Sequence, residues 1–436
     1  MKKLIVSILI LMSLSVGSVY AVGHDFDFGG ETVVIAESVD LEEIFSEGEN
    51  LAHLQQIKRD FNVEIEFIHA NWAQIRDQLG PAIMAGDVFA DVFGFAHRNL
   101  WPQVTQGYLL PLNEALEEID YYNRLPEYAR TYLRESANWN GHLFGFGIHL
   151  GRPFGLLWNK SLFEREGLPN LYELYNDGDW TWDAFRDIVE NVTRDTTGDG
   201  EIDLWGFTGN DDLNLWLRTN ATTGLRFEDN RPVVPMQEEA AMDTALFLHD
   251  LISRELIYSR AHRGERRDIF NEGRSAMHIG PPGYYTGIPE DSQDEFGYVP
   301  MPKGPAADRH VAPDGGYIRQ LRIPINTEHD PAALIELTSA LLQHIEPYTD
   351  IQADYDELVN NFAMGAQDFE SIESYEYMLH NMEMDFFHIN SITSNVRAAW
   401  AGEISVAAGI EQGLQADQAR MDDAFDAIEE VYGIAE

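Results

Sequence analysis

The stretch Val63–Phe95, VEIEFIHANWAQIRDQLGPAIMAGDVFADVFGF, sets the fold class of this 436-residue chain. Its first six residues alternate in polarity as in a half-buried strand, residues 72–85 have apolar side chains at helical spacing, and Val88–Phe95 is a second strand pattern. Upstream, TVVIA at residues 32–36 is another strand pattern, and residues 51–61 are helical. The resulting order of strand, helix, strand, helix and strand predicts an α/β fold with a mostly parallel, helix-covered sheet.

Similar patterns continue to the end of the chain. GFGIHL and FGLLWN read as strands on either side of Gly151-Arg152-Pro153, and Thr181 is placed to cap a helix. Beyond Gly315-Gly316 a strand pattern, YIRQLRIPI, precedes a helix that starts near Asp330-Pro331. The last hundred residues are mainly helical and end in a long acidic amphipathic segment over about 410–432.

The N-terminus has the layout of an export signal. Two lysines precede an apolar run over residues 4–16, and small residues lead to Ala21, so residues 1–21 are predicted to be a cleaved signal peptide. A permanent anchor is the alternative, because residues 4–21 are nearly long enough to span a bilayer. The chain contains no cysteine, which excludes disulfides, thiolate metal ligands and a cysteine-linked lipid anchor. The mature chain is therefore expected in the periplasm or outside the cell, not lipid-anchored.

The charge balance excludes some partners. Acidic residues outnumber basic ones by 74 to 29, giving a net charge of −45. Such a surface repels nucleic acid and anionic lipid. It stays hydrated in brine, where salt screens its self-repulsion, and so indicates a halophilic or alkaline habitat. The roughly 415 residues that follow the signal are too many for one core and suit two lobes.

Eight short pieces, in order along the mature chain, resemble the extracellular solute-binding proteins of carbohydrate-type ABC importers, the group that contains maltose-binding protein. No single piece is specific, but their order behind an export signal is. The pieces are HLQQIKRDFNVEIEF, AGDVFADVFGF, GYLLPLNE, NGHLFGFGI followed by LLWNKSLFEREGLP, TWDAF, FNEGRSAMHIGPPGYY, FGYVPMPKG and GGYIRQLRIPIN.

This resemblance implies the type II-like, two-lobed periplasmic-binding-protein fold, with the ligand in a cleft between the lobes. Chain crossings are expected near residues 148–153, 314–317 and 377–381, and glycines and prolines at the first two suit hinges. The implied lobes are residues 22–149 plus 317–378 for the N-terminal lobe and residues 152–314 plus 380–436 for the C-terminal lobe.

The resemblance also implies the function. A sugar or oligosaccharide that touches both lobes shifts the population towards the closed form, which a membrane permease of an ABC transporter would recognise. The protein is expected to be a monomer, to need no cofactor and to catalyse no reaction. A binding protein that feeds a chemoreceptor would have the same fold.

Sugar sites combine aromatic platforms with planar polar side chains. The resemblance supports Phe95, His97 and Arg98 as ligand contacts, because they align with the family's aromatic-plus-charge segment just past the carboxyl end of a strand. Arg152, at the first crossing, occupies a position that the family often fills with a polar ligand contact. Tyr317, beside Gly315-Gly316, is a further candidate.

The segment GPPGYY, residues 280–285, departs from the family pattern. Relatives commonly have a tryptophan here that stacks on sugar, whereas this chain offers Tyr284 and Tyr285, which leaves the sugar's identity open. For each of these aromatic residues, core packing is the alternative. Nearby, four arginines could bind an anionic sugar such as a uronate, or could form a solvated helix face. They are Arg260, Arg263, Arg266 and Arg267.

The stretch DTTGDGEIDLWGF, residues 195–207, almost matches a calcium-binding loop. The residues that would offer oxygen ligands are Asp195, Thr197, Asp199, Glu201 and Asp203. Gly200 sits where the template needs a sharp turn, but Gly206 replaces the bidentate glutamate at position twelve. The loop is therefore predicted to be a structural turn that can hold calcium as a local brace, not a switch.

A secreted glycoside hydrolase is the competing class, since it too would need an aromatic cleft and paired carboxylates. With 74 acidic residues, however, two carboxylates close in sequence indicate nothing by themselves. The sequence also shows no nucleophile elbow, phosphate loop or HExxH motif.

Overall fold

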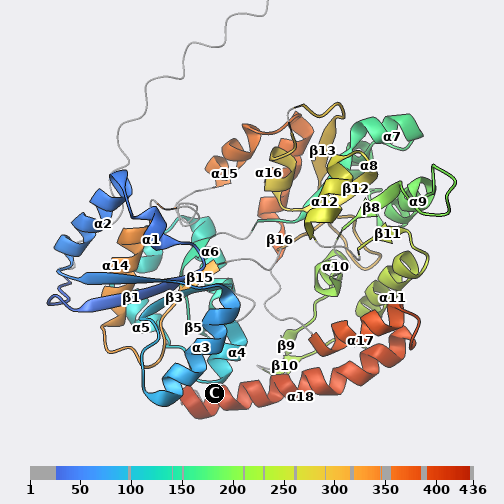
Figure 1. Ribbon diagram of the computed structural model, residues 1–436. Helices are drawn as coiled ribbons and strands as arrows, with labels where there is room; N and C mark the ends of the chain where they lie inside the picture. The colour runs from blue at the N-terminus through green and yellow to red at the C-terminus, as the bar shows by residue number, and fades with distance from the viewer. Residues whose placement is uncertain are drawn as a thin grey trace, which may run out of the picture.

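The computed structural model shows two α/β lobes, each with its own five-stranded sheet (Figure 1). The predicted two-lobed fold class is confirmed. The signal segment, His97, Arg98 and Tyr317 lie outside the described residues. The structure describes residues 26–96, 100–139, 141–149, 152–209, 212–228, 231–259, 263–289, 291–314, 319–343, 345, 355–383 and 390–432.

The sheet of the first lobe has the strand order β2-β1-β3-β15-β6. Its strands are β1 (Thr32–Glu37), β2 (Glu64–His69), β3 (Val92–Ala96), β6 (Phe146–His149) and β15 (Arg319–Arg322). β1 pairs in parallel with β2 and β3, whereas β15 runs antiparallel to β3 and β6. The parallel part is the one that the opening stretch of sequence predicts.

Helices cover this sheet on both faces. Asn71 caps α3 through a capping box with Gln74, and the helix ends at Gly86 in the left-handed conformation. α14 is buried over residues 332–342, and its Glu336 forms a buried ion pair of 2.6 Å with Arg124. The helices are α1 (Leu41–Ile44), α2 (Gly48–Asp60), α3 (Trp72–Ala85), α4 (Leu100–Thr105), α5 (Asn113–Glu118), η2 (Tyr121–Arg124), α6 (Glu127–Ser136) and α14 (Pro331–Leu342), and β4 (Asn138–Trp139) and β5 (His142–Leu143) form a hairpin.

The sheet of the second lobe has the order β11-β8-β12-β7-β13. Its strands are β7 (Gly155–Asn159), β8 (Trp205–Thr208), β11 (Ile257–Tyr258), β12 (Ser275–Gly280) and β13 (Phe296–Val299). β7 is antiparallel to both its neighbours, β12 and β13. All residues of the central strands β12 and β7 are buried, as expected for strands covered on both faces, and those of the edge strand β13 are buried too, where α16 (Phe369–His380) packs against it.

An aromatic core lies beside this sheet. Trp182, at the start of α9, stacks on Phe247 of α11 with ring centroids 4.3 Å apart. The other elements of the lobe are α7 (Lys160–Glu166), α8 (Leu171–Asp177), α9 (Trp182–Val192), α10 (Leu213–Thr219), the hairpin of β9 (Arg226–Glu228) and β10 (Arg231–Val233), α11 (Glu239–Ser253), α12 (Arg263–Asn271), α13 (Pro282–Thr286) and α17 (Asn390–Trp400).

Two helices lie in a different lobe from the one predicted. The resemblance gives residues 317–378 to the N-terminal lobe, but α15 (Tyr355–Ala363) and α16 (Phe369–His380) pack on the second lobe. The Ser371 hydroxyl accepts a hydrogen bond of 3.0 Å from the backbone N–H of Tyr298 in β13, and Asp368 forms an ion pair of 2.6 Å with Lys160. The chain therefore returns to the second lobe before residue 355.

The final helix, α18 (Val406–Tyr432), runs from the second lobe to the first along the bottom of the view in Figure 1. It packs on α17 and α11 of the second lobe and on α4 of the first. At its end, the Tyr432 hydroxyl donates a hydrogen bond of 2.9 Å to the carbonyl of Leu109 in the first lobe. α18 thus connects the lobes in addition to the chain crossings.

The first two predicted crossings lie next to each other, but the third, near residues 377–381, is not a crossing, because α16 before it and α17 after it both pack on the second lobe. β14 (Ala312–Pro313) pairs in parallel with β16 (Met382–Glu383), and Pro153 forms an antiparallel bridge with Asp314. These short pairings leave few hydrogen bonds to break when the lobes rotate. Among the described residues, no helix combines the length and the apolar character needed to cross a bilayer.

Candidate ligand-binding site

The carboxyl ends of the first lobe's parallel strands form one edge of its sheet. β1 ends there at Glu37 and β3 at Ala96, and the antiparallel β15 starts there at Arg319, which pairs with Ala96. In open α/β sheets this is the edge at which ligands bind.

Glu37 holds Arg319 in place at this edge. Glu37 is fully buried, and it fits only because residue 94 is glycine, since a Cβ on Gly94 would lie 1.8 Å from Glu37 Oε1. Arg319 Nε lies 3.4 Å from the same oxygen, and Arg319 Nη2 donates to Ser38 Oγ at 3.0 Å. A buried carboxylate thus fixes the direction of a largely buried guanidinium.

Trp72, at the start of α3, lies beside this arginine. The guanidinium carbon of Arg319 is 6.0 Å from the centre of the Trp72 ring. Trp72 is half-buried as a residue, and its Nε1 and Arg319 Nη1 are both buried atoms without a hydrogen-bond partner among the described residues. This edge, which we call the Trp72 half-site (Glu37, Trp72 and Arg319), combines an aromatic ring with unused donors.

The corresponding edge of the second lobe is built around Tyr284. β12 ends at Gly280, whose missing side chain makes room for this ring, because a Cβ there would lie 2.4 Å from Tyr284 Cδ2. The ring stacks on buried His278, with centroids 5.8 Å apart and planes 16° apart. The half-buried Tyr284 therefore has a fixed position at the end of the sheet.

Arginines surround Tyr284. The guanidinium carbon of Arg267 is 5.1 Å from the Tyr284 ring centre. Arg266 donates to the carbonyls of Gly209 and Ser259, which holds the first turn of α12 at this edge. Arg152 is exposed, and its Nη1 would lie 3.9 Å from a Cβ placed on Gly283. We call Arg152, Arg267 and Tyr284 the Tyr284 half-site.

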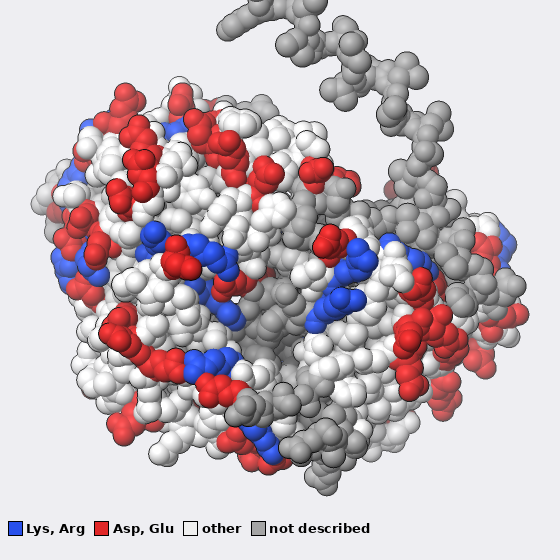
Figure 2. All heavy atoms as spheres, turned by 180° about the vertical axis from the view of Figure 1, so that it is seen from behind, with Lys and Arg blue, Asp and Glu red and all other residues white. Residues whose placement is uncertain are grey.

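The two half-sites are joined by the first crossing. His149, the last residue of β6, pairs with Arg319. Arg152 follows three residues later, a reach of at most about 11 Å. The space-filling view shows a hollow between the lobes with Lys and Arg side chains on both of its sides (Figure 2). The two strand edges, one from each lobe, thus lie at the two ends of the first crossing.

The predicted ligand contacts separate into two groups. Arg152 and Tyr284 come together, as described above. Phe95 and Tyr285 are instead 2% and 1% exposed, so neither ring presents a face to a ligand in this arrangement.

The Phe95 and Tyr285 rings are buried because their side chains point into the core. Phe95 lies under Trp72, with ring centroids 6.3 Å apart, and beside Arg322. The Tyr285 ring stacks on Phe362 of α15, and its hydroxyl accepts a hydrogen bond of 2.9 Å from the backbone N–H of Gln367. The sequence did not point to Glu37 or Arg319, although each lies at a strand end.

The acidic loop is organised by its own backbone. Asp195 accepts hydrogen bonds from the N–H groups of Thr197, Gly198 and Gly200 at 2.6–2.9 Å. Asp203 accepts from the N–H and hydroxyl of Thr196, and Asp199 from the N–H of Glu201.

These contacts lower the pKa of Asp195, chiefly through the N–H groups of Gly200 and Gly198. Within the described part of the chain, which includes this loop, no three His, Cys, Asp or Glu side chains are grouped to hold a metal ion. The structural turn is therefore present, and calcium binding stays a prediction.

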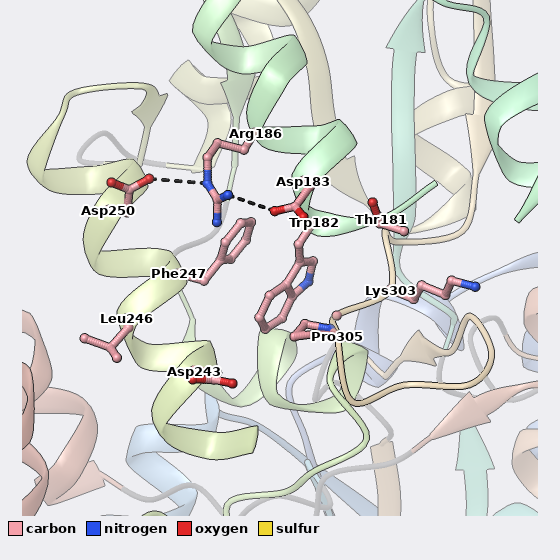
Figure 3. Close-up of a pocket in the computed structure, with 11 residues that line it drawn as sticks. Thr181, Trp182, Asp183, Arg186, Asp243, Leu246, Phe247, Asp250, Lys303 and Pro305 are labelled. Atoms are coloured by element: carbon pink, nitrogen blue, oxygen red, sulfur yellow. Dashed lines mark hydrogen bonds and ion pairs between the residues drawn. The ribbon is translucent and has the colours of Figure 1, made fainter. Parts of the chain in front are cut away.

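A separate pocket of about 420 Å³ lies between α9, α11 and the loop over residues 303–305 (Figure 3). Its Arg186 is paired with Asp183 at 2.8 Å and with Asp250 at 3.4 Å. All its lining residues belong to the second lobe, so it cannot respond to a ligand that must touch both lobes.

The comparisons with known proteins agree with this architecture. The family model of the bacterial extracellular solute-binding proteins matches residues 52–331. A comparison with curated proteins finds no match.

Three solved structures share the fold at low sequence identity. An ABC substrate-binding protein from Listeria monocytogenes in complex with cycloalternan has a TM-score of 0.62 and 12% identity, covering 93% of this chain and 100% of the other. The maltose/maltodextrin-binding domain MalE from Bdellovibrio bacteriovorus bound to maltotriose has a TM-score of 0.61 and 16% identity, covering 89% and 99%. A cyclo/maltodextrin-binding protein complexed with maltotetraose has a TM-score of 0.62 and 12% identity, covering 89% and 97%.

Proposed function

The chain belongs to the bacterial extracellular solute-binding proteins, and on this premise we propose that it is the substrate-binding component of an ABC transporter that captures a sugar or oligosaccharide. The names of its structural neighbours support this class of ligand, since all three were solved with oligosaccharides. A relationship at 12–16% identity establishes only the fold, so the ligand class needs its own evidence.

That evidence is the pairing of the two half-sites. Trp72 and Tyr284 offer ring faces for the C–H surfaces of a sugar, and Arg319, Arg152 and Arg267 offer donors for its oxygens. Neither half-site alone surrounds a ligand. A saccharide that contacts both gains its full set of interactions only when the lobes close, and it therefore shifts the population to the closed form.

The remaining parts of the proposal follow from this role. The signal segment over residues 1–21 exports the chain, the mature protein acts without a lipid anchor as a monomer, and the closed form delivers its ligand to the permease subunits of the transporter. No catalytic step is part of the proposal. Incubation with oligosaccharides should therefore release no reducing ends, and turnover would instead support the hydrolase alternative.

Thermal-shift screening of a saccharide library, at high salt because of the acidic surface, tests the proposal. A ligand that binds only the folded chain raises the melting temperature by mass action. Trp72→Ala should weaken the best ligand by about 1 kcal/mol or more, the scale of one aromatic contact. Phe369→Ala is the matched control, because this ring is 66% exposed on α16 and belongs to neither half-site. If no saccharide shifts the melting temperature, the proposal is wrong.

A further inference from the structure

Arginines converge on the two half-sites in a chain whose net charge is −45. Arg319 lies at the first lobe's edge, and on the second lobe Arg267 lies over the Tyr284 ring and Arg152 lies beside Gly283. Arg266 lies at the same edge, where it donates to the carbonyls of Gly209 and Ser259. The chain has 29 basic residues against 74 acidic ones, so this concentration is not what the composition alone would produce.

Many other arginines in the second lobe are neutralised by carboxylates. Arg274 lies 2.5 Å from Glu272, Arg254 lies 2.5 Å from Glu190, and Arg194 lies 2.8 Å from Glu166. None of the ion pairs found within the described residues involves Arg267, whose guanidinium lies over the Tyr284 ring instead. On the first lobe, Glu37 offsets Arg319 in part, but Arg319 Nη1 still lacks a hydrogen-bond partner among the described residues.

We propose that the saccharide is acidic and that it carries carboxylates, as oligouronides do. This proposal rests on the function proposed above. A carboxylate accepts two parallel N–H bonds from one guanidinium, which a neutral hydroxyl cannot do. The ring of a uronide still has the C–H face that Tyr284 and Trp72 suit. Closing over a neutral sugar would remove the Arg267 guanidinium from water without bringing a carboxylate to it, which is costly.

The acidic surface opposes this ligand only at long range. Repulsion between charges that are separated by more than a Debye length, about 8 Å at physiological salt, is largely screened. Contact pairs between an enclosed carboxylate and Arg267 or Arg152 are screened much less. High salt should therefore help an acidic saccharide to approach the protein and remove less of its contact energy.

Calorimetry with size-matched probes tests the inference. The acidic probes are trimers of galacturonate, glucuronate and mannuronate, and the neutral probes are the corresponding uncharged hexose trimers. We expect the best oligouronide to bind the wild-type chain at least tenfold more tightly than its neutral counterpart, about 1.4 kcal/mol. Arg267→Gln should remove most of this preference. Arg274→Gln, which changes an arginine of the same lobe outside the half-site, should keep it.

The outcomes separate this inference from the function beneath it. If neutral oligosaccharides bind tightly, carboxylates add no affinity and Arg267→Gln has no effect, the proposal of an acidic ligand is wrong. The proposed solute-binding function would then still hold. If a sulfated oligosaccharide binds more tightly than any uronide, and its binding depends on Arg267 in the same way, the proposal that the ligand carries carboxylates is wrong. Binding of no saccharide at all overturns both proposals.

Discussion

At the residue scale, the direction of a side chain decides whether it serves the core or the ligand. Phe95 belongs to a segment in which the family places ligand contacts, yet its ring is 2% exposed beneath Trp72. The resemblance pointed to this strand end, but the sequence could not show which side chain covers which, because that depends on how α3 packs on the sheet.

Phe95→Ala should therefore act mainly on stability. Removal of a buried phenylalanine ring costs about 3–5 kcal/mol of unfolding free energy, measurable by urea denaturation. Phe369→Ala, at a ring that is 66% exposed, should change the unfolding free energy by no more than about 0.5 kcal/mol. A Phe95→Ala protein of unchanged stability that has lost its ligand would show that Phe95 is a contact residue after all.

His278, the platform under Tyr284, should stay neutral. Burial lowers its pKa from 6.5 to about 3. Its contribution to stability is therefore complete above pH 6.5 and declines as the pH falls from 6.5 towards 3, by up to about 1.4 kcal/mol per pH unit. The His278 ring resonances, assigned by comparison with a His278→Gln spectrum, should not titrate between pH 8 and pH 4. Titration near pH 6 would mean that the ring is solvated and the Tyr284 stack open.

At the element scale, local patterns gave most of the secondary structure, and long-range packing gave the rest. Alternating and helical spacings predicted β1, β2, α3 and β3 and the parallel start of the first sheet. No local pattern could assign α16 to the second lobe, because that position depends on contacts such as Lys160 with Asp368, which are 208 residues apart. The Trp72 half-site was missed for the same reason, since Glu37, Trp72 and Arg319 come from distant strands and one helix.

The acidic loop offers a prediction about calcium. Because the Asp195 carboxylate already accepts N–H bonds from Thr197, Gly198 and Gly200, the turn should form without a metal ion. Asp195→Ala should lower the melting temperature by no more than a few degrees, because the loop is exposed. If calcium raises the melting temperature after chelation, and Asp195→Asn abolishes the rise, the loop is a calcium site.

At the scale of the whole molecule, the two lobes are joined by chain crossings beside short backbone pairings and by α18. Pro153 pairs with Asp314 and β14 with β16, whereas α18 contacts α11 in one lobe and α4 in the other. Rotation about the hinge must therefore be accompanied by a shift where α18 meets the first lobe. In the proposed function one ligand contacts both half-sites, and its binding supplies the energy for this rotation.

Closure of the two lobes around a ligand can be measured by small-angle X-ray scattering of the mature chain, with and without the saccharide that calorimetry shows to bind most tightly. Closure of the lobes should give a smaller radius of gyration and a shorter maximum dimension when the ligand is bound. The same ligand should leave the scattering of a Trp72→Ala, Arg267→Gln double variant unchanged at the concentration that closes the wild-type chain. Identical profiles for the wild-type chain with and without a ligand that calorimetry shows to be bound would contradict the account.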